Sequence, residues 1–353
     1  MLVTGASGFK GGWLTIWLRQ LGAKVIGAAL KSPPSNPSAS QVLGLDKMLI
    51  WSYGDLRNHR WFESVVERHQ PEVVIHMAAQ PIVLESYKDP YSTLATNVMG
   101  TASVLEAVRK SSCVKACIVV TSDKCYAESS SPRREVDRLG GHDPYSMSKA
   151  AAELVTASYT KSFFTGGDVG VASVRAGNVI GGGDWGLGRI VPDAMRAWNS
   201  SQTLAVRHPT FIRPWQHVLE PLSGYLWLTS LLLTEPRAYS EAWNFGPEPG
   251  DVISVRDLLT LLADNWGGGS WSSEEDRQEH ESSYLQLDTT KVLTRLHWSP
   301  AWDTRRAVAE TVAWYRQYYQ GAAPCDLYNF TLSQIATFAA DARARRISWA
   351  CER

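Results

Sequence analysis

The feature that most constrains the fold is a glycine-rich turn between a short apolar segment and a helical one, near the start of the 353-residue chain. Gly5, Gly8 and Gly11 follow the apolar residues Leu2–Thr4 and lead into the helical stretch Gly12–Gln20. Glycines allow a tight turn, close approach of the backbone to a diphosphate, and close packing of helix on sheet. The free N–H groups and the dipole at the start of the helix favour an anion. The turn therefore predicts a phosphate-binding site; the alternative is a plain strand-to-helix connection.

Apolar strands and helical stretches alternate through the first half of the chain. This alternation predicts an α/β fold with a parallel sheet covered on both faces, and right-handed crossovers give it the doubly wound arrangement of a Rossmann fold. The place of the glycine turn after the first strand favours its phosphate-binding interpretation. The expected strands are Leu2–Thr4, Lys24–Ala28, Glu72–His76, Ala116–Thr121 and Val171–Arg175, and the expected helices are Gly12–Gln20, Asp55–Arg68, Tyr91–Lys110 and Tyr145–Phe164.

After Arg175 glycines and prolines interrupt the regular alternation. We expect loops and short elements there, at the start of a smaller C-terminal substrate-binding domain. Surface loops are expected over Ser32–Ser40 and Gly267–Glu275, and a frayed helix beyond Asp341. The expected domains are a dinucleotide-binding domain over 1–175 with a returning segment near 212–246, a substrate-binding domain over 176–211 and 247–340, and a tail over 341–353.

Charge and cysteine content exclude several classes of protein. Lys plus Arg and Asp plus Glu number 35 each, so the basic excess that nucleic-acid binding needs is missing. No apolar run approaches the roughly 20 residues that cross a bilayer, and the first residues do not resemble a signal peptide. The five cysteines are odd in number and lack zinc-ligand spacing. We expect a cytoplasmic protein with reduced thiols, no metal, and neither a membrane nor nucleic acid as partner.

Tyr145 and Lys149 lie four residues apart at the head of a helical stretch, and therefore on one helix face. A phenol has an ordinary pKa of about 10, and a neighbouring ammonium lowers that pKa. Tyrosinate can then accept a hydroxyl proton while hydride leaves the same carbon. The same spacing is common in surface pairs, but its position downstream of the glycine turn favours the catalytic interpretation.

Ser122, Asp123 and Lys124 directly follow the expected strand Ala116–Thr121. Ligands of doubly wound sheets bind beyond the carboxyl ends of the strands, so these side chains are candidates for the same site. Adjacent residues of a strand point to opposite faces, so the backbone must curl for Asp123 and Lys124 to converge. The alternative is a Ser-Asp turn with an exposed lysine.

The second strand ends without the acidic residue that usually binds the ribose of NAD. Lys31 stands there instead and suits either a 2′-phosphate or plain exposure to solvent. These residues alone leave NAD and NADP open.

Together, eight segments resemble the extended short-chain dehydrogenase/reductase family and, within it, the nucleotide-sugar 4,6-dehydratases that act on CDP-glucose. The resemblance extends to about residue 340, and Asp123–Tyr126 is among its most specific strings. The sequence departs from the family pattern at three places: Ser122 replaces threonine, Leu84 replaces arginine, and the loop Ala127–Arg134 is shorter. The segments are Thr4–Trp13, His76–Pro81, Thr96–Thr101, Thr121–Tyr126, Asp143–Lys149, Arg175–Trp185, Arg213–Tyr225 and Trp243–Pro247.

The resemblance implies NAD-dependent conversion of CDP-glucose into CDP-4-keto-6-deoxy-glucose. Tyr145, assisted by Lys149, would deprotonate the 4-hydroxyl as hydride passes from C4 to NAD. Ser122 would form a hydrogen bond with the oxygen at C4. Lys124 would remove the C5 proton, and a protonated Asp123 would assist loss of the 6-hydroxyl before hydride returns to C6. The remaining implied residues bind cofactor (Gly5, Gly8, Phe9, Lys10, Gly11, Asp55, Leu56, Ala78, Ala79, Gln80, Asn97) or substrate (Asn178, Arg189, Arg213).

Two other functions stay open at this stage. A nucleotide-sugar 4-epimerase needs only NAD and the Tyr–Lys pair, and a catalytically silent protein would only bind the dinucleotide or sugar nucleotide. The resemblance also implies a homodimer, or a tetramer, in which the helices Tyr91–Lys110 and Tyr145–Phe164 pair across a two-fold axis.

Overall fold

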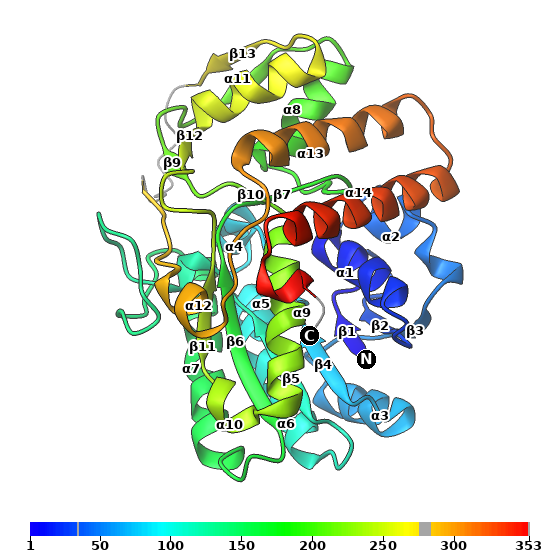
Figure 1. The fold of residues 1–353 in the computed structure, drawn as a ribbon, viewed down its shortest axis with the longest axis vertical. Helices are drawn as coiled ribbons and strands as arrows, with labels where there is room; N and C mark the ends of the chain where they lie inside the picture. The colour runs from blue at the N-terminus through cyan, green and yellow to red at the C-terminus, as the bar shows by residue number, and fades with distance from the viewer. Residues whose placement is uncertain (34, 275–283, 352–353) are drawn as a thin grey trace.

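The computed structural model describes residues 1–33, 35–274 and 284–351. At its centre is a seven-stranded sheet in the order β11-β6-β5-β4-β1-β2-β3, in which every neighbouring pair is parallel (Figure 1). The predicted doubly wound α/β fold is confirmed. The strands are β1 (Leu2–Thr4), β2 (Ile26–Ala29), β3 (Ile50–Tyr53), β4 (Val73–His76), β5 (Ala116–Val120), β6 (Gly170–Ala176) and β11 (Ala242–Phe245).

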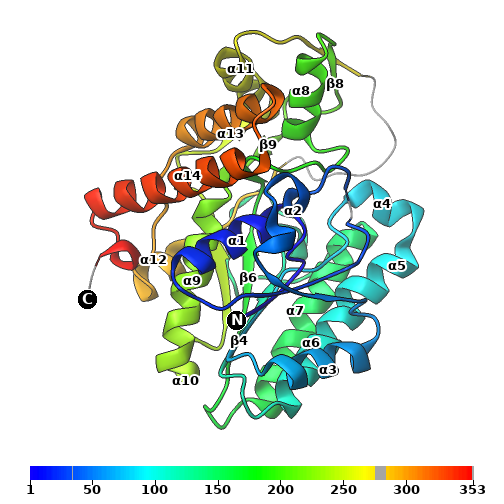
Figure 2. The same cartoon turned by 90° about the vertical axis from the view of Figure 1, so that its right-hand side faces the viewer.

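The central strands are continuous apolar runs because helices cover both faces of the sheet (Figure 2). Successive side chains of β5 enter opposite cores: Ile118 and Val120 belong to one apolar cluster, and Cys117 and Val119 to the other. The first core contains side chains of α1 (Phe9–Gln20), α9 (Leu219–Thr234) and α14 (Pro324–Ala344); the second contains those of α3 (His59–His69) and α6 (Gly100–Lys110), and α7 (Pro144–Phe163) packs against that side.

The expected helix Tyr91–Lys110 is divided into three segments: α5 (Pro90–Leu94), the π-helical η2 (Ala95–Met99) and α6. The expected helix Asp55–Arg68 begins later, at His59, because the side chain of Asn58 accepts a hydrogen bond from the backbone of Trp61 and caps it there. Strands β3 and β11 are absent from the sequence expectations.

The second lobe occupies the top of the molecule in Figure 1. It is built largely from α8 (Ile190–Asn199), α11 (Val255–Trp266) and α13 (Thr304–Tyr319), with small two-stranded sheets. Between α8 and α11 the chain returns through α9 to the main sheet, where β11 pairs with β6. The domain bounds stay a prediction. The remaining elements are α2 (Ala39–Val42), α4 (Val83–Lys88), α10 (Pro236–Tyr239), α12 (Thr290–Arg295), η1 (Leu45–Lys47), η3 (Asp123–Cys125), η4 (Ser348–Ala350), β7 (Val179–Ile180), β8 (Leu204–Val206), β9 (Ile212–Arg213), β10 (Gln216–His217), β12 (Ile253–Ser254) and β13 (Trp271–Ser273).

Two expected loops are each interrupted by a short regular element, and the expectation of a frayed tail is wrong. The loop expected over 32–40 contains the start of α2, where Ser38 forms a capping box. The loop expected over 267–275 contains β13, which pairs with β8. The tail is not frayed, because α14 continues to Ala344 and Trp349 stacks on Phe338 with ring centroids 5.4 Å apart. Pro34, Glu275 and the last two residues of the tail lie outside the described residues. Within the described ranges, no helix has the length and apolar character to span a membrane.

Candidate active site

A cavity of about 630 Å³ lies beyond the carboxyl ends of β1, β4, β5 and β6, below the second lobe. This is where a doubly wound sheet binds its ligands. Gln80 and Asn97 do not line it. The nominated residues that do line it are Gly5, Gly8, Phe9, Lys10, Gly11, Asp55, Leu56, Ala78, Ala79, Ser122, Asp123, Lys124, Tyr145, Lys149, Asn178, Arg189 and Arg213.

The glycine turn leaves no room for a side chain at Gly5 or Gly11. Gly5 has a φ of +71°, and a Cβ atom on Gly11 would lie 2.2 Å from the carbonyl oxygen of Gly5. Gly8 is the N-cap of α1 and offers no side-chain cap, so the first N–H groups of the helix keep their capacity for an anion. The turn therefore fits the diphosphate of a dinucleotide.

A chain of buried hydrogen bonds supports the cavity wall after β4. Thr4 Oγ1 accepts from the backbone N–H groups of Met77 and Ala78, each at 3.1 Å, so its own hydroxyl donates to His76 Nδ1 at 2.8 Å. The Nε2–H of His76 then donates to Thr101 Oγ1 at 3.2 Å. Burial lowers the pKa of His76 to about 3, which keeps this tautomer neutral.

Gln80 and Asn97 support the wall from behind. Asn97 Oδ1 accepts from the backbone N–H of Gln80 at 2.8 Å, and its Nδ2 donates to Gln80 O at 3.1 Å and to Ser148 Oγ at 2.8 Å. The side chain of Asn97 thus fastens the segment after β4 to α7. Direct contact of Gln80 and Asn97 with a cofactor stays a prediction.

Tyr145 and Lys149 project from the first turns of α7, which Asp143 caps by accepting from the backbone N–H of Ser146 at 2.9 Å. Lys149 Nζ donates to Val120 O at 3.2 Å. Burial raises the pKa of Tyr145 to about 12, although a hydrogen bond with Ser122 acts in the opposite direction, and burial lowers the pKa of Lys149 to about 8. The expected lowering of the tyrosine pKa by Lys149 is therefore wrong for the protein alone, because desolvation is the largest influence on the phenol and Lys149 is not among the groups that shift its pKa.

The curl expected after β5 is confirmed: η3 begins directly after Ser122. Ser122 Oγ accepts from the backbone N–H of Lys124 at 3.2 Å and donates to Asp123 Oδ1 at 3.0 Å. Asp123 is buried, and its Oδ2 has no hydrogen-bond partner among the described residues. Burial raises the pKa of Asp123, which favours the neutral acid. A carboxyl whose pKa is raised by burial, an amine and a phenol thus face one cavity.

Two arginines stand on the side of the cavity formed by the second lobe. Arg189 Nη1 lies 2.9 Å from Asp184 Oδ2, and the guanidinium of Arg213 lies 5.1 Å from the centre of the Phe211 ring. Such forked cations suit a diphosphate. Asp184 lies within the Arg175–Trp185 segment but is absent from the site residues expected from the sequence. Its role as the ion partner of Arg189 depends on the fold, which brings the two side chains together.

Comparisons with known proteins place the chain among relatives of known activity and similar fold. Residues 1–240 match the NAD dependent epimerase/dehydratase family. The chain is 43% identical to a CDP-glucose 4,6-dehydratase of Salmonella typhimurium over 91% of each chain, and 29% identical to a dTDP-glucose 4,6-dehydratase of Streptomyces antibioticus over 77% of each. Its fold is similar to that of a dTDP-glucose 4,6-dehydratase from Streptomyces venezuelae solved with NAD and TYD, with a TM-score of 0.77, 23% identity, and coverage of 90% of this chain and 96% of that one.

Proposed function

The chain belongs to the NAD dependent epimerase/dehydratase family, and we propose that it is an NAD-dependent lyase that converts CDP-glucose into CDP-4-keto-6-deoxy-glucose and water. The observation that carries the proposal is the meeting of Asp123 and Lys124 with Tyr145 and Lys149 on one cavity. NAD, bound at the glycine turn and beside Ala78, supplies an acceptor and store for hydride during the cycle.

Tyr145 is the base for the 4-hydroxyl of the sugar. In the protein without ligands the pKa of the Tyr145 phenol is about 12, so the phenol keeps its proton near neutrality. To act as a base it must pass that proton to another group, and positive charge near it in the ligand-bound site must lower its pKa. Ser122, which is hydrogen-bonded to the phenol, also faces the sugar oxygen. Lys149 lies on the same helix face, with a pKa of about 8 that allows it to exchange protons near neutrality.

Asp123 and Lys124 perform the elimination. Once C4 is a ketone, the C5 proton is acidic, and Lys124 is the base that removes it. Asp123, whose pKa is raised by burial, gives a proton to the departing 6-hydroxyl, which leaves as water. Epimerisation at C4 needs neither group, which is why this pair favours dehydration.

The nucleotide diphosphate binds opposite the glycine turn. Arg189 and Arg213 supply the positive charge, and Asn178 supplies an amide on the same wall. The choice of cytosine as the base follows the 43% identical relative.

Turnover in deuterated water tests the proposal. With CDP-glucose we expect loss of the 6-hydroxyl and one deuterium at C5. Inversion at C4 alone would show an epimerase instead, and binding without turnover of CDP-, dTDP-, UDP- and GDP-glucose would show a silent binder. Lys124→Ala is expected to bind CDP-glucose normally but to form no product.

We further propose that the protein works in the cytoplasm as a homodimer or a tetramer. The five cysteines are free, as in reducing compartments. Large apolar side chains are exposed on the expected pairing helices: Tyr91 on α5, Met99 on η2, and Leu154 and Phe163 on α7. A monomeric mass by light scattering would contradict the assembly.

A further inference from the structure

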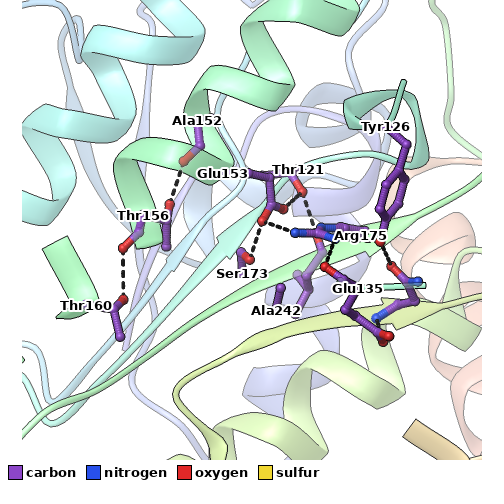
Figure 3. Close-up of polar contacts among 12 residues, drawn as sticks. Thr121, Tyr126, Glu135, Ala152, Glu153, Thr156, Thr160, Ser173, Arg175 and Ala242 are labelled. Carbon is purple, nitrogen blue, oxygen red and sulfur yellow. Dashed lines mark hydrogen bonds and ion pairs between the residues drawn. The ribbon is translucent and has the colours of Figure 1, made fainter. Parts of the chain in front are cut away.

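A buried ion pair lies behind the catalytic turn and outside the cavity wall (Figure 3). Glu153 is on α7, one helical turn after Lys149, and Arg175 is on β6. Their side chains are each 3% exposed, and Arg175 Nη2 lies 2.7 Å from Glu153 Oε2. The reaction proposed above uses neither residue.

The carboxylate of Glu153 holds one end of the catalytic turn. Its Oε1 accepts a hydrogen bond from the hydroxyl of Thr121, the residue that joins β5 to Ser122. Its Oε2 accepts from Ser173 Oγ at 2.7 Å as well as from Arg175. Because Glu153 and Lys149 share a helix, the carboxylate fixes the end of β5 relative to the Tyr145–Lys149 pair.

The guanidinium of Arg175 holds the other end. Its Nη1 donates to the hydroxyl of Tyr126 at 2.5 Å and to Glu135 O at 3.2 Å, and it stands 4.8 Å from the centre of the Tyr126 ring. Tyr126, which directly follows η3, donates in turn to Asn244 Oδ1 at 2.8 Å. The turn that carries Asp123 and Lys124 is therefore clamped at both ends by one ion pair.

A buried ion pair is weak evidence for a stabilising role, because desolvation offsets much of its attraction. What this pair does supply is geometry, since the planar fork of arginine fixes both distance and direction. Tyr145 and Lys149 are held by the 20-residue helix α7, whereas Asp123 and Lys124 lie on a three-residue 3-10 turn. Short helices of this kind do not hold themselves in place.

We propose that Glu153 and Arg175 are positioning residues for the elimination half of the reaction, holding Asp123 and Lys124 in register with Tyr145 and Lys149. This inference rests on the proposed function. A misplacement of about 1 Å costs up to 100-fold in rate, so loosening the turn slows proton removal at C5 before it affects oxidation at C4.

Tyr126→Phe is the test variant, because it removes one hydroxyl from the clamp and leaves the aromatic ring over the guanidinium. We expect kcat to fall about tenfold with the KM for CDP-glucose unchanged, and deuterium entry at C5 to slow equally. In a single turnover, absorbance of the reduced cofactor should accumulate, because oxidation continues while elimination lags. Tyr159→Phe, on the outer part of α7, is the matched control and should change none of these.

Glu153→Gln removes the negative charge of the ion pair, and Arg175→Lys removes the planar fork of the guanidinium. Both variants should slow elimination relative to oxidation more strongly than Tyr126→Phe does. Equal slowing of both half-reactions, or a lower thermal midpoint with unchanged kcat, would overturn the inference and leave the proposed function intact. If the unaltered enzyme exchanged no deuterium at C5, the proposed function itself would fail and the inference with it.

Discussion

The two sides of the cavity are built by different means. The cofactor wall, formed by the Gly5–Gly11 turn and Ala78–Ala79, presents backbone and is fixed by short hydrogen bonds around Thr4 and His76. The sugar wall, formed by Lys124, Asn178, Arg189 and Arg213, presents long side chains. A wall of backbone tolerates no added atom, whereas a wall of side chains can be altered one group at a time. We therefore expect cofactor binding to depend on the rigid side of the cavity and substrate choice on the adjustable side.

Gly11→Ala should produce the largest effect, and on the cofactor wall alone. The new Cβ would lie 2.2 Å from Gly5 O and 2.8 Å from Ala6 Cα, neither of which is a flexible side-chain end. We expect NAD affinity to fall at least about 100-fold by calorimetry, given the several kcal/mol that such overpacking costs. Gly250→Ala, where a Cβ meets nothing within 4 Å, is the control and should bind NAD normally.

Arg189→Met should act on the sugar wall alone, with the next largest effect. Loss of a charged hydrogen-bond donor to a diphosphate costs about 1.5–3 kcal/mol, so KM for CDP-glucose should rise roughly 10- to 100-fold while NAD affinity stays the same. Arg305→Met, on the exposed face of α13, serves as control. A matching loss of NAD affinity would show that the two walls are not independent.

Asp184→Asn should have a smaller effect in the same assay. It leaves the Arg189 guanidinium in place but removes the ion partner 2.9 Å from its Nη1. The arginine then orients less well, and we expect KM to rise about three- to tenfold, as for the loss of a hydrogen bond worth about 1 kcal/mol. An unchanged KM would mean that the substrate alone orients Arg189.

The last prediction concerns stability at low pH, and its effect on either wall at neutral pH is the smallest. Burial lowers the pKa of both His76 and His217 to about 3, below the ordinary 6.5. Above pH 6.5 the two neutral histidines make their full contribution to the free energy of unfolding. As the pH falls from 6.5 toward 3, the free energy of unfolding decreases by about 1.4 kcal/mol per pH unit for each histidine, because only the unfolded chain takes up the protons. In urea titrations, His76→Asn and His217→Phe should each flatten this slope.

The two histidines should differ at neutral pH. His76 bonds through both ring nitrogens beneath the cofactor wall, so His76→Asn should lower the free energy of unfolding by about 1–3 kcal/mol. His217 packs between Trp13 and Trp302, and its Nε2 has no partner in the described part of the chain, so His217→Phe should cost less. Equal losses would contradict this difference.

Local sequence predicted the elements whose signal is local. Strand β1 was placed with its observed bounds, and β5 to within one residue, because a strand covered on both faces reads as an apolar run. Strand β3 was missed because it lies at the sheet edge, with Ile50 and Tyr53 exposed. Strand β11 depends on pairing with β6, which lies far away in the sequence.

The candidate site divides in the same way. Spacing alone placed Tyr145 and Lys149 on one helix face, and the glycines in one turn. Asp184 and the Glu153–Arg175 pair could not be found from spacing, because each acts through a partner brought near by the fold. The raised pKa of Tyr145 was also hidden, since it depends on how deeply the phenol is buried.

The late return of the chain to its sheet has a consequence for biosynthesis. Strand β6 is completed at Ala176, but its outer neighbour β11 begins only at Ala242, after α8 of the second lobe and the helix α9 have been translated. Until then the nascent protein presents an unpaired apolar edge, which is a template for aggregation. Ribosome-bound chains that end before Ala242 should therefore bind chaperones, and chains long enough for Phe245 to have left the ribosomal tunnel should release them.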